Sequence, residues 1–255
     1  MSATKKFTLK LTNTYPLNSR MRHLEFEILG DRLEYIPGQF ISLQIPHEGH
    51  TVRRNFSIAN SPSKHNKIEI AATFVPNGIA STMLWNMQIG DRLQASGPLG
   101  IFILPNHIPN IKRYILVATG TGVTPYRAML NQLSDWLTDP TNQCVLLLGV
   151  RDYQELLYKA DFTNFANNYP NFKFISCYSR ENPADSNYPV EPLDNLIAQR
   201  FGYVQQQFDS LDINAKNDLI YLCGNPNMVE ESLTMLEPYK IPKHKIKREK
   251  YISSK

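Results

Sequence analysis

The chain has 255 residues, enough for one large domain or two domains of ordinary size. Hydrophobic residues make up 42% of it and charged residues 20%, which predicts an ordered globular protein and excludes a disordered one. The 27 basic and 23 acidic residues leave a formal charge of +4, too small and too scattered to indicate nucleic-acid binding.

Cysteine spacing and the length of the apolar runs predict a cytoplasmic protein without a metal centre. The three cysteines, Cys144, Cys177 and Cys223, match no zinc or iron–sulfur pattern, and so few thiols fit a reducing compartment. The longest apolar runs, such as Cys144–Val150, are too short to cross a membrane, and the N-terminus has no signal-peptide core.

Up to about residue 104, short alternating segments separated by turn residues predict strands, at a spacing typical of an antiparallel barrel or sandwich. One helix, Ala80–Asn86, is expected after Asn77-Gly78. The expected strands are Thr8–Leu11, His23–Ile28, Phe40–Gln44, Asn55–Ile58, Ile68–Phe74 and Arg92–Ala95.

Beyond Pro105 strands and helices alternate, which is the pattern of an open parallel sheet with crossover helices. Residues Leu104–Asn110 form a plausible linker between the two parts. The expected strands are Arg113–Ala118, Cys144–Gly149, Phe172–Ser176 and Leu219–Cys223, and the expected helices are Tyr126–Leu137, Glu155–Asn167, Leu193–Arg200 and Met228–Leu236.

The densest basic run, Lys240–Lys250, leaves two interpretations open. It holds six Lys or Arg residues and one His, interrupted by Ile and Pro. It is either a solvated segment of the tail or a docking surface for an acidic partner protein.

Arg54-Asn55-Phe56-Ser57 is the first motif with a chemical interpretation. On a strand, side chains two residues apart share a face, so Arg54 and Phe56 can address one ligand. A flavin needs positive charge for its pyrophosphate, a flat apolar surface for its ring and a hydroxyl near N5, which Ser57 offers.

Glycines introduce two further candidate anion sites. Gly78 leads into a helix start, where free backbone N–H groups favour an anion and Ser81 can add a hydroxyl. The turn Gly120-Thr121-Gly122-Val123-Thr124-Pro125 follows a strand and precedes a helix, as in phosphate sites, although Pro125 stands where the dinucleotide fingerprint has its third glycine.

Polar groups follow several strands of the expected parallel sheet. Arg151 follows the second strand, and Ser179-Arg180 follows the third; these groups suit a nucleotide that carries a 2′-phosphate. Cys223-Gly224-Asn225-Pro226 ends the last strand, and its glycine allows a ligand to approach closely. Tyr251 follows Glu249 near the C-terminus and is expected to be tucked against the protein.

Together, in this order and spacing, these motifs resemble the ferredoxin–NADP reductase superfamily, from about Gly38-Gln39-Phe40 to Tyr251. The resemblance implies a six-stranded antiparallel barrel that binds FAD, over residues 1–106. It further implies an NADP-binding parallel α/β domain over residues 107–255, whose C-terminal tail returns to the flavin.

The resemblance also implies roles for single residues. Arg54 would contact the FAD phosphates, Phe56 would replace the usual Tyr beside the flavin ring, and Gly78–Ser81 would line the pyrophosphate. Ser179 and Arg180 would hold the 2′-phosphate and Tyr203 the adenine. The residues expected to bind the cofactors are Arg54, Asn55, Phe56, Ser57, Ala72, Thr73, Gly78, Ile79, Ala80, Ser81, Gly120, Thr121, Gly122, Thr124, Pro125, Arg151, Ser179, Arg180, Tyr203, Gly224, Asn225, Pro226 and Tyr251, and the expected catalytic residues are Ser57, Cys223, Glu249 and Tyr251.

The implied activity is hydride transfer from NADPH to FAD, followed by transfer of single electrons to ferredoxin or flavodoxin, by a monomer. Tyr251 would act as a gate that swings aside for the nicotinamide. One alternative is an NAD(P)H-dependent reductase component that serves an oxygenase or a haem protein. Another is a binding module of the same fold that has lost its cofactor.

Overall fold

The computed structural model describes residues 4–105, 108–182 and 197–251. These residues fall into two compact units. The first comprises residues 4–104 and 124–129, and the second comprises the described residues of 105–123 and 130–252. A domain boundary after residue 106 stays a prediction, because residues 106 and 107 lie outside the described part.

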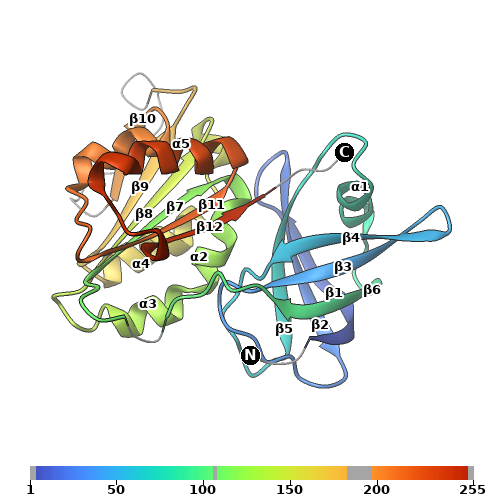
Figure 1. Cartoon of the computed structure of the whole chain (residues 1–255). Coiled ribbons are helices and arrows are strands. Elements are labelled where there is room, and N and C mark those ends of the chain that lie inside the picture. The colour runs from blue at the N-terminus through green and yellow to red at the C-terminus, as the bar shows by residue number, and fades with distance from the viewer. Residues whose placement is uncertain (1–3, 106–107, 183–196, 252–255) are drawn as a thin grey trace. The chain divides into compact units, whose positions relative to one another are not determined.

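The first unit is built on a six-stranded antiparallel sheet in the order β4-β3-β6-β1-β2-β5, which confirms the expected strands (Figure 1). Alternation along the strands places one set of side chains inside: Ile41, Leu43 and Ile45 of β3 are fully buried. The elements are β1 (Lys5–Pro16), β2 (Met21–Leu29), β3 (Phe40–His47), β4 (His50–Ser57), β5 (Lys67–Thr73), α1 (Ile79–Asn86) and β6 (Arg92–Leu99).

The second unit is built on a six-stranded parallel sheet in the order β10-β9-β8-β7-β11-β12, as the alternation of strands and helices predicts. Its central strands are buried along nearly their whole length, which is typical of a parallel sheet covered on both faces. The strands are β7 (Arg113–Thr119), β8 (Gln143–Val150), β9 (Phe172–Tyr178), β10 (Ile197–Phe201), β11 (Asp218–Gly224) and β12 (Ile246–Lys250).

Helices cover both faces of the parallel sheet (Figure 1). On one face α5 (Pro226–Leu236) and the 3₁₀ segment η3 (Val204–Leu211) pack against the sheet. On the other, Trp136 of α3 (Leu130–Trp136) packs on Tyr114, and Phe162 of α4 (Lys159–Asn168) packs on Phe174. Shorter 3₁₀ segments are η1 (Gly120–Val123), η2 (Tyr153–Glu155), η4 (Glu237–Tyr239) and η5 (Lys243–Lys245). Within the described ranges, no helix reaches the length and hydrophobicity that crossing a bilayer requires.

The helix expected over Tyr126–Leu137 is interrupted at Met129. Helix α2 (Thr124–Ala128) precedes the break and α3 follows it, so the break falls where the chain leaves the first unit for the second. Met129 is fully buried, and its side chain lies beside Gly38. Tertiary packing therefore outweighs the helical periodicity at this point.

One other expectation about secondary structure is wrong, and one strand was not expected. Within the helix expected over Leu193–Arg200, residues 193–196 lie outside the described part and the rest forms β10, which pairs in parallel with β9. Residues Ile246–Lys250, which belong to the basic run, form β12 along the edge of β11. Both are edge strands in which no side chain is buried, so neither has the apolar pattern that marks a strand in the sequence.

Candidate functional site

A cleft of about 450 Å³ opens at the carboxyl ends of the parallel strands, where open α/β sheets bind ligands. It lies wholly within the second unit. The structure thus brings together residues that the sequence analysis selected from five separate segments. These residues are Gly120, Arg151, Ser179, Arg180, Tyr203 and Asn225.

Two glycines let the loops at the base of this cleft come together. A side chain on Gly122 would overlap the backbone of Cys223 and Gly224, and one on Gly224, whose φ is +133°, would overlap Thr119. The Asn225 amide then donates a hydrogen bond of 2.9 Å to the Thr119 hydroxyl. The turn and the end of β11 therefore form one closely packed base, as a backbone cradle for a phosphate requires.

The glycine turn itself is divided between the two units. Gly120, Thr121 and Gly122 lie in η1 of the second unit, whereas Thr124 and Pro125 lie in α2 and are buried in the first.

Arg151, a predicted phosphate contact, is already held by a carboxylate. Its Nε donates to Glu155 Oε2 at 2.9 Å, and its Nη2 donates to Glu155 Oε1. These hydrogen bonds raise the pKa of Arg151 above its ordinary value. Glu155 was not among the predicted site residues, although its spacing of four residues from Arg151 is a signal for an ion pair.

Ser179 and Arg180 leave the sheet beside Arg151. The Ser179 amide donates to the Val150 carbonyl at 3.0 Å, and the Arg180 amide donates to the Arg151 carbonyl at 2.9 Å. This backbone pairing sets the two arginines on adjacent loops at the cleft. Within the described residues, no carboxylate forms an ion pair with Arg180. Tyr203, on the same cleft, is 57% exposed and can offer its ring to a ligand.

Cys223, Glu249 and Tyr251 come together at the end of β11. Cys223 and Glu249 are partners in the parallel ladder, and the Tyr251 amide donates to the Gly224 carbonyl at 2.7 Å. Burial, together with the charge of Glu249, raises the pKa of the Cys223 thiol, while a hydrogen bond from the Tyr251 side chain lowers it. Burial dominates, so Cys223 is a neutral thiol at neutral pH and not a nucleophile.

The Arg54–Ser57 segment is the end of β4 in the first unit. Arg54 and Phe56 are both half-buried, with exposed Asn55 between them and Ser57 buried at the end. Phe56 rests partly on the barrel core, which leaves part of its ring uncovered by the core. The pair therefore fits a ligand with a charged group and a flat apolar ring. Of the two predicted FAD-binding residues on β5, Ala72 is buried and Thr73 is half-buried.

The start of α1 differs in detail from the expected anion site. Gly78 caps the helix, and Ile79 packs against the barrel core. The Ser81 hydroxyl accepts a hydrogen bond from the Val75 amide at 3.1 Å and lies 2.9 Å from the Val75 carbonyl, to which it can donate. In this structure Ser81 therefore stabilises the turn before the helix. The backbone N–H groups of the first helical turn are the groups that can meet a phosphate.

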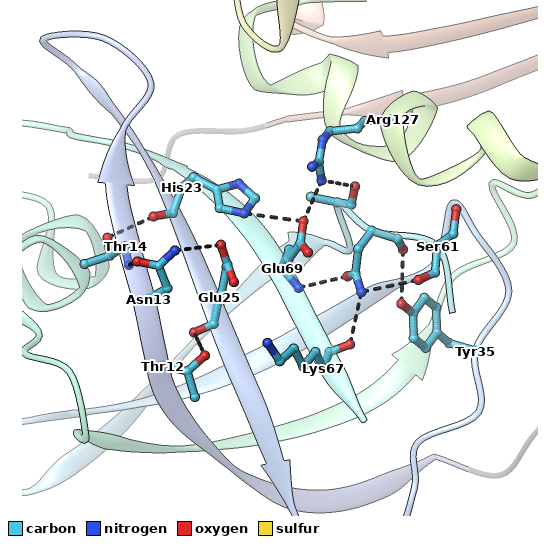
Figure 2. A network of polar contacts seen from close by, with 12 residues as sticks. Thr12, Asn13, Thr14, His23, Glu25, Tyr35, Ser61, Lys67, Glu69 and Arg127 are labelled. Carbon is cyan, nitrogen blue, oxygen red and sulfur yellow. Dashed lines mark hydrogen bonds and ion pairs between the residues drawn. The ribbon is translucent and has the colours of Figure 1, made fainter. Parts of the chain in front are cut away.

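A polar network inside the first unit contains residues that the sequence analysis did not select (Figure 2). Arg127 of α2 donates to Glu69 of β5 at 2.6 Å and to the Ala59 carbonyl at 2.9 Å. The buried imidazole of His23 lies 3.4 Å from the same carboxylate. Burial by itself would raise the pKa of Glu69, but the hydrogen bonds from His23 and Arg127 outweigh it and lower the pKa to about 2. Helix α2, which begins with the last two residues of the glycine turn, is thus tied to the barrel.

Two family profiles match the chain in the same order as the two units. The oxidoreductase FAD-binding domain matches residues 7–103, and the oxidoreductase NAD-binding domain matches residues 116–233. Together they account for most of the chain and place a cofactor-binding domain on each of the two sheets.

Individual relatives have more than one role. The chain is 31% identical over 202 residues to the toluate 1,2-dioxygenase electron transfer component of Pseudomonas putida, covering 78% of this chain and 54% of that protein. It is 29% identical over 230 residues to ferredoxin–NADP reductase B of Sorangium cellulosum, covering 88% of each. Among solved structures, a cytochrome P450 reductase from Amycolatopsis superposes with a TM-score of 0.83 at 25% identity, over 97% of this chain and 70% of that one. The chain spans 54–62% of the length of several curated relatives that it matches.

Proposed function

Because the chain belongs to the ferredoxin–NADP reductase superfamily of FAD- and NAD-binding oxidoreductases, we propose that it is an NADPH-dependent reductase for ferredoxin or flavodoxin. The observation that carries this proposal is the cleft of the second unit, which combines a tight glycine turn with Ser179 and Arg180. A guanidinium and a hydroxyl on consecutive residues of one loop suit a phosphate on the adenosine ribose. A cytoplasmic location and a monomeric state belong to the same proposal.

The protein's own residues would bind and orient the cofactors. When bound, the flavin supplies the exchange between hydride transfer and single-electron transfer. Arg54 would neutralise the FAD phosphates, and Phe56 would support the ring. Ser57 and Glu249 would hold the proton near flavin N5, and the neutral Cys223 would pack against the nicotinamide.

Electron transfer with each dinucleotide tests the proposal directly. The purified protein is expected to be yellow and to reduce a dye or a cytochrome with NADPH. Added ferredoxin or flavodoxin should accelerate cytochrome reduction. A colourless protein that cannot be reconstituted with FAD would contradict the enzymatic proposal and favour a binding module.

The second candidate is a reductase component of an oxygenase or a haem protein. It is favoured by the match to the toluate dioxygenase component, a protein of which this chain covers 54%. A clear preference for NADH, with no response to ferredoxin or flavodoxin, would support this candidate and would contradict the roles proposed for Ser179 and Arg180.

A further inference from the structure

The charged groups around the cleft are balanced. Arg151 and Arg180 line it, and so do Glu155 and Glu231. The two carboxylates have different partners, because Glu155 binds Arg151 whereas Glu231 accepts a hydrogen bond of 2.5 Å from the Gln205 amide. A net positive charge in the cleft would strengthen binding of a dinucleotide that carries an extra phosphate. The ion pair of Arg151 with Glu155 removes part of that positive charge.

The Arg151–Glu155 pair is built into an ordered turn. Asp152 caps η2 by accepting a hydrogen bond of 3.1 Å from the Glu155 amide, which orders the turn between Arg151 and Glu155. The Tyr153 amide donates to Glu181 at 3.0 Å, which links the same turn to the loop that carries Arg180. The Glu155 side chain is 15% exposed and the Arg151 side chain is 35% exposed, so water screens this pair less than a fully exposed one but does not leave it unscreened.

Pairing limits what Arg151 can offer to a ligand. Two nitrogens of its guanidinium are directed at Glu155, and the carboxylate adds a negative charge at the place where a phosphate would bind. A phosphate would have to displace Glu155 or share Arg151 with it. A ribose hydroxyl carries no charge and meets no such repulsion.

We propose that Glu155 is a specificity-determining residue, which restrains Arg151 and so reduces the preference of the cleft for a 2′-phosphorylated dinucleotide. The inference rests on the proposed function only in taking the cleft as the dinucleotide site. Arg180 carries most of the recognition of the 2′-phosphate, and Arg151 becomes a full contact only when Glu155 is neutralised.

Equilibrium binding of two small probes tests the inference without any electron transfer. Adenosine 2′,5′-bisphosphate carries the distinguishing phosphate and AMP lacks it, and calorimetry measures both. Glu155→Gln should tighten binding of the bisphosphate roughly tenfold, since the amide keeps the shape but removes the charge. Binding of AMP should change less than about twofold.

Glu231→Gln is the matched control. It removes a carboxylate from the same cleft, but this carboxylate is bonded to Gln205 and not to an arginine. An equal gain in Glu155→Gln and Glu231→Gln would mean a general effect of charge and would overturn the inference. So would an unchanged ratio of the two affinities in Glu155→Gln.

A double-mutant cycle tests whether the gain in Glu155→Gln comes through Arg151, and its Arg151→Ala variant can be measured even if Glu155→Gln loses stability. Arg151→Ala alone should weaken binding of the bisphosphate less than threefold. In the Glu155→Gln background the same change should remove the whole tenfold gain, and additive effects would overturn the inference. If the wild-type protein binds neither probe, the proposed dinucleotide site fails and the inference with it, whereas binding that ignores Glu155 removes the inference alone.

Discussion

Asp218 holds the start of the central strand β11 in the second unit. Its carboxylate accepts hydrogen bonds from Arg113 at 2.9 and 2.6 Å and from the Asn214 amide at 2.7 Å. It is only 1% exposed, so removal of the carboxylate would leave a mostly buried guanidinium without its counter-ion.

We predict that Asp218→Ala lowers the free energy of unfolding by about 3 kcal/mol. Chemical denaturation followed by circular dichroism measures the change. Lys112→Gln is the control, because it removes an exposed pair with Asp139 and should leave the unfolding midpoint nearly unchanged. Equal effects of the two substitutions would show that burial does not increase the contribution of the Arg113–Asp218 pair to the free energy of unfolding.

Substitution of Tyr251 gives a direct kinetic test of the proposed function. Its side chain hydrogen-bonds to the Cys223 thiol at the end of β11, where the nicotinamide is proposed to bind. If the ring occupies the nicotinamide's place, Tyr251→Ser should tighten binding of NADP⁺ and slow turnover. Tyr251→Phe keeps the ring and should leave the affinity for NADP⁺ close to that of the wild type. Unchanged affinity in Tyr251→Ser would argue against a gate.

The tie between α2 and the barrel has a pH dependence that follows from Glu69. The pKa of Glu69 falls from its ordinary 4.5 to about 2 in the folded protein. A lowered pKa contributes stability that is complete above the unfolded value and is lost as the pH falls through the folded value. The contribution should therefore disappear between about pH 4.5 and pH 2.

We expect Glu69→Gln to lower the free energy of unfolding by about 1–2 kcal/mol at pH 6. This range allows for the partial exposure of the carboxylate to solvent. Its difference from the wild type should shrink toward pH 2, as measured by denaturant unfolding at a series of pH values. Glu25→Gln is a control from the cross-strand neighbour of Glu69, whose carboxylate accepts from the neutral Asn13 amide. A difference between Glu69→Gln and the wild type that does not vary with pH would contradict the proposed balance of charges.

Elements differ in how well local sequence predicts them. The barrel strands and β7, β8, β9 and β11 were predicted because their side chains alternate or form apolar runs with turn residues at their ends. Strands β10 and β12 were missed because each lies at an edge of the sheet, where burial is partial and the pattern is weak. Pairing with a neighbouring strand, and not local propensity, makes these segments extended.

At the scale of the whole molecule, the cleft lies within one unit, so a ligand for it should stabilise that unit. At a concentration 100 times its dissociation constant, adenosine 2′,5′-bisphosphate should add about 2.7 kcal/mol. This corresponds to a rise of roughly 5–10 °C in the midpoint of the transition that belongs to the second unit, measured by calorimetry. The absence of any rise at saturation would show that the cleft does not hold the adenosine end of a dinucleotide.

Short motifs were sufficient to predict two cofactor-binding sheets and several residues that line the cleft. Gly122 and Gly224 are informative, because a backbone that closely approaches another loop excludes a side chain. The ends of parallel strands meet at one edge by geometry, so Arg151, Ser179 and Asn225 could be assigned to one site before their contacts were known.

Folding decided which charges meet. Glu69 and Arg127 are 58 residues apart in the chain, and nothing local indicates that they share a hydrogen bond. Glu155 stands close to Arg151 in the sequence, yet only the capped turn of η2 directs its carboxylate into the cleft and onto the guanidinium. Residue type and spacing specify which chemical groups are present, whereas the strength of a charge depends on its neighbours and its burial, and those exist only in the folded chain.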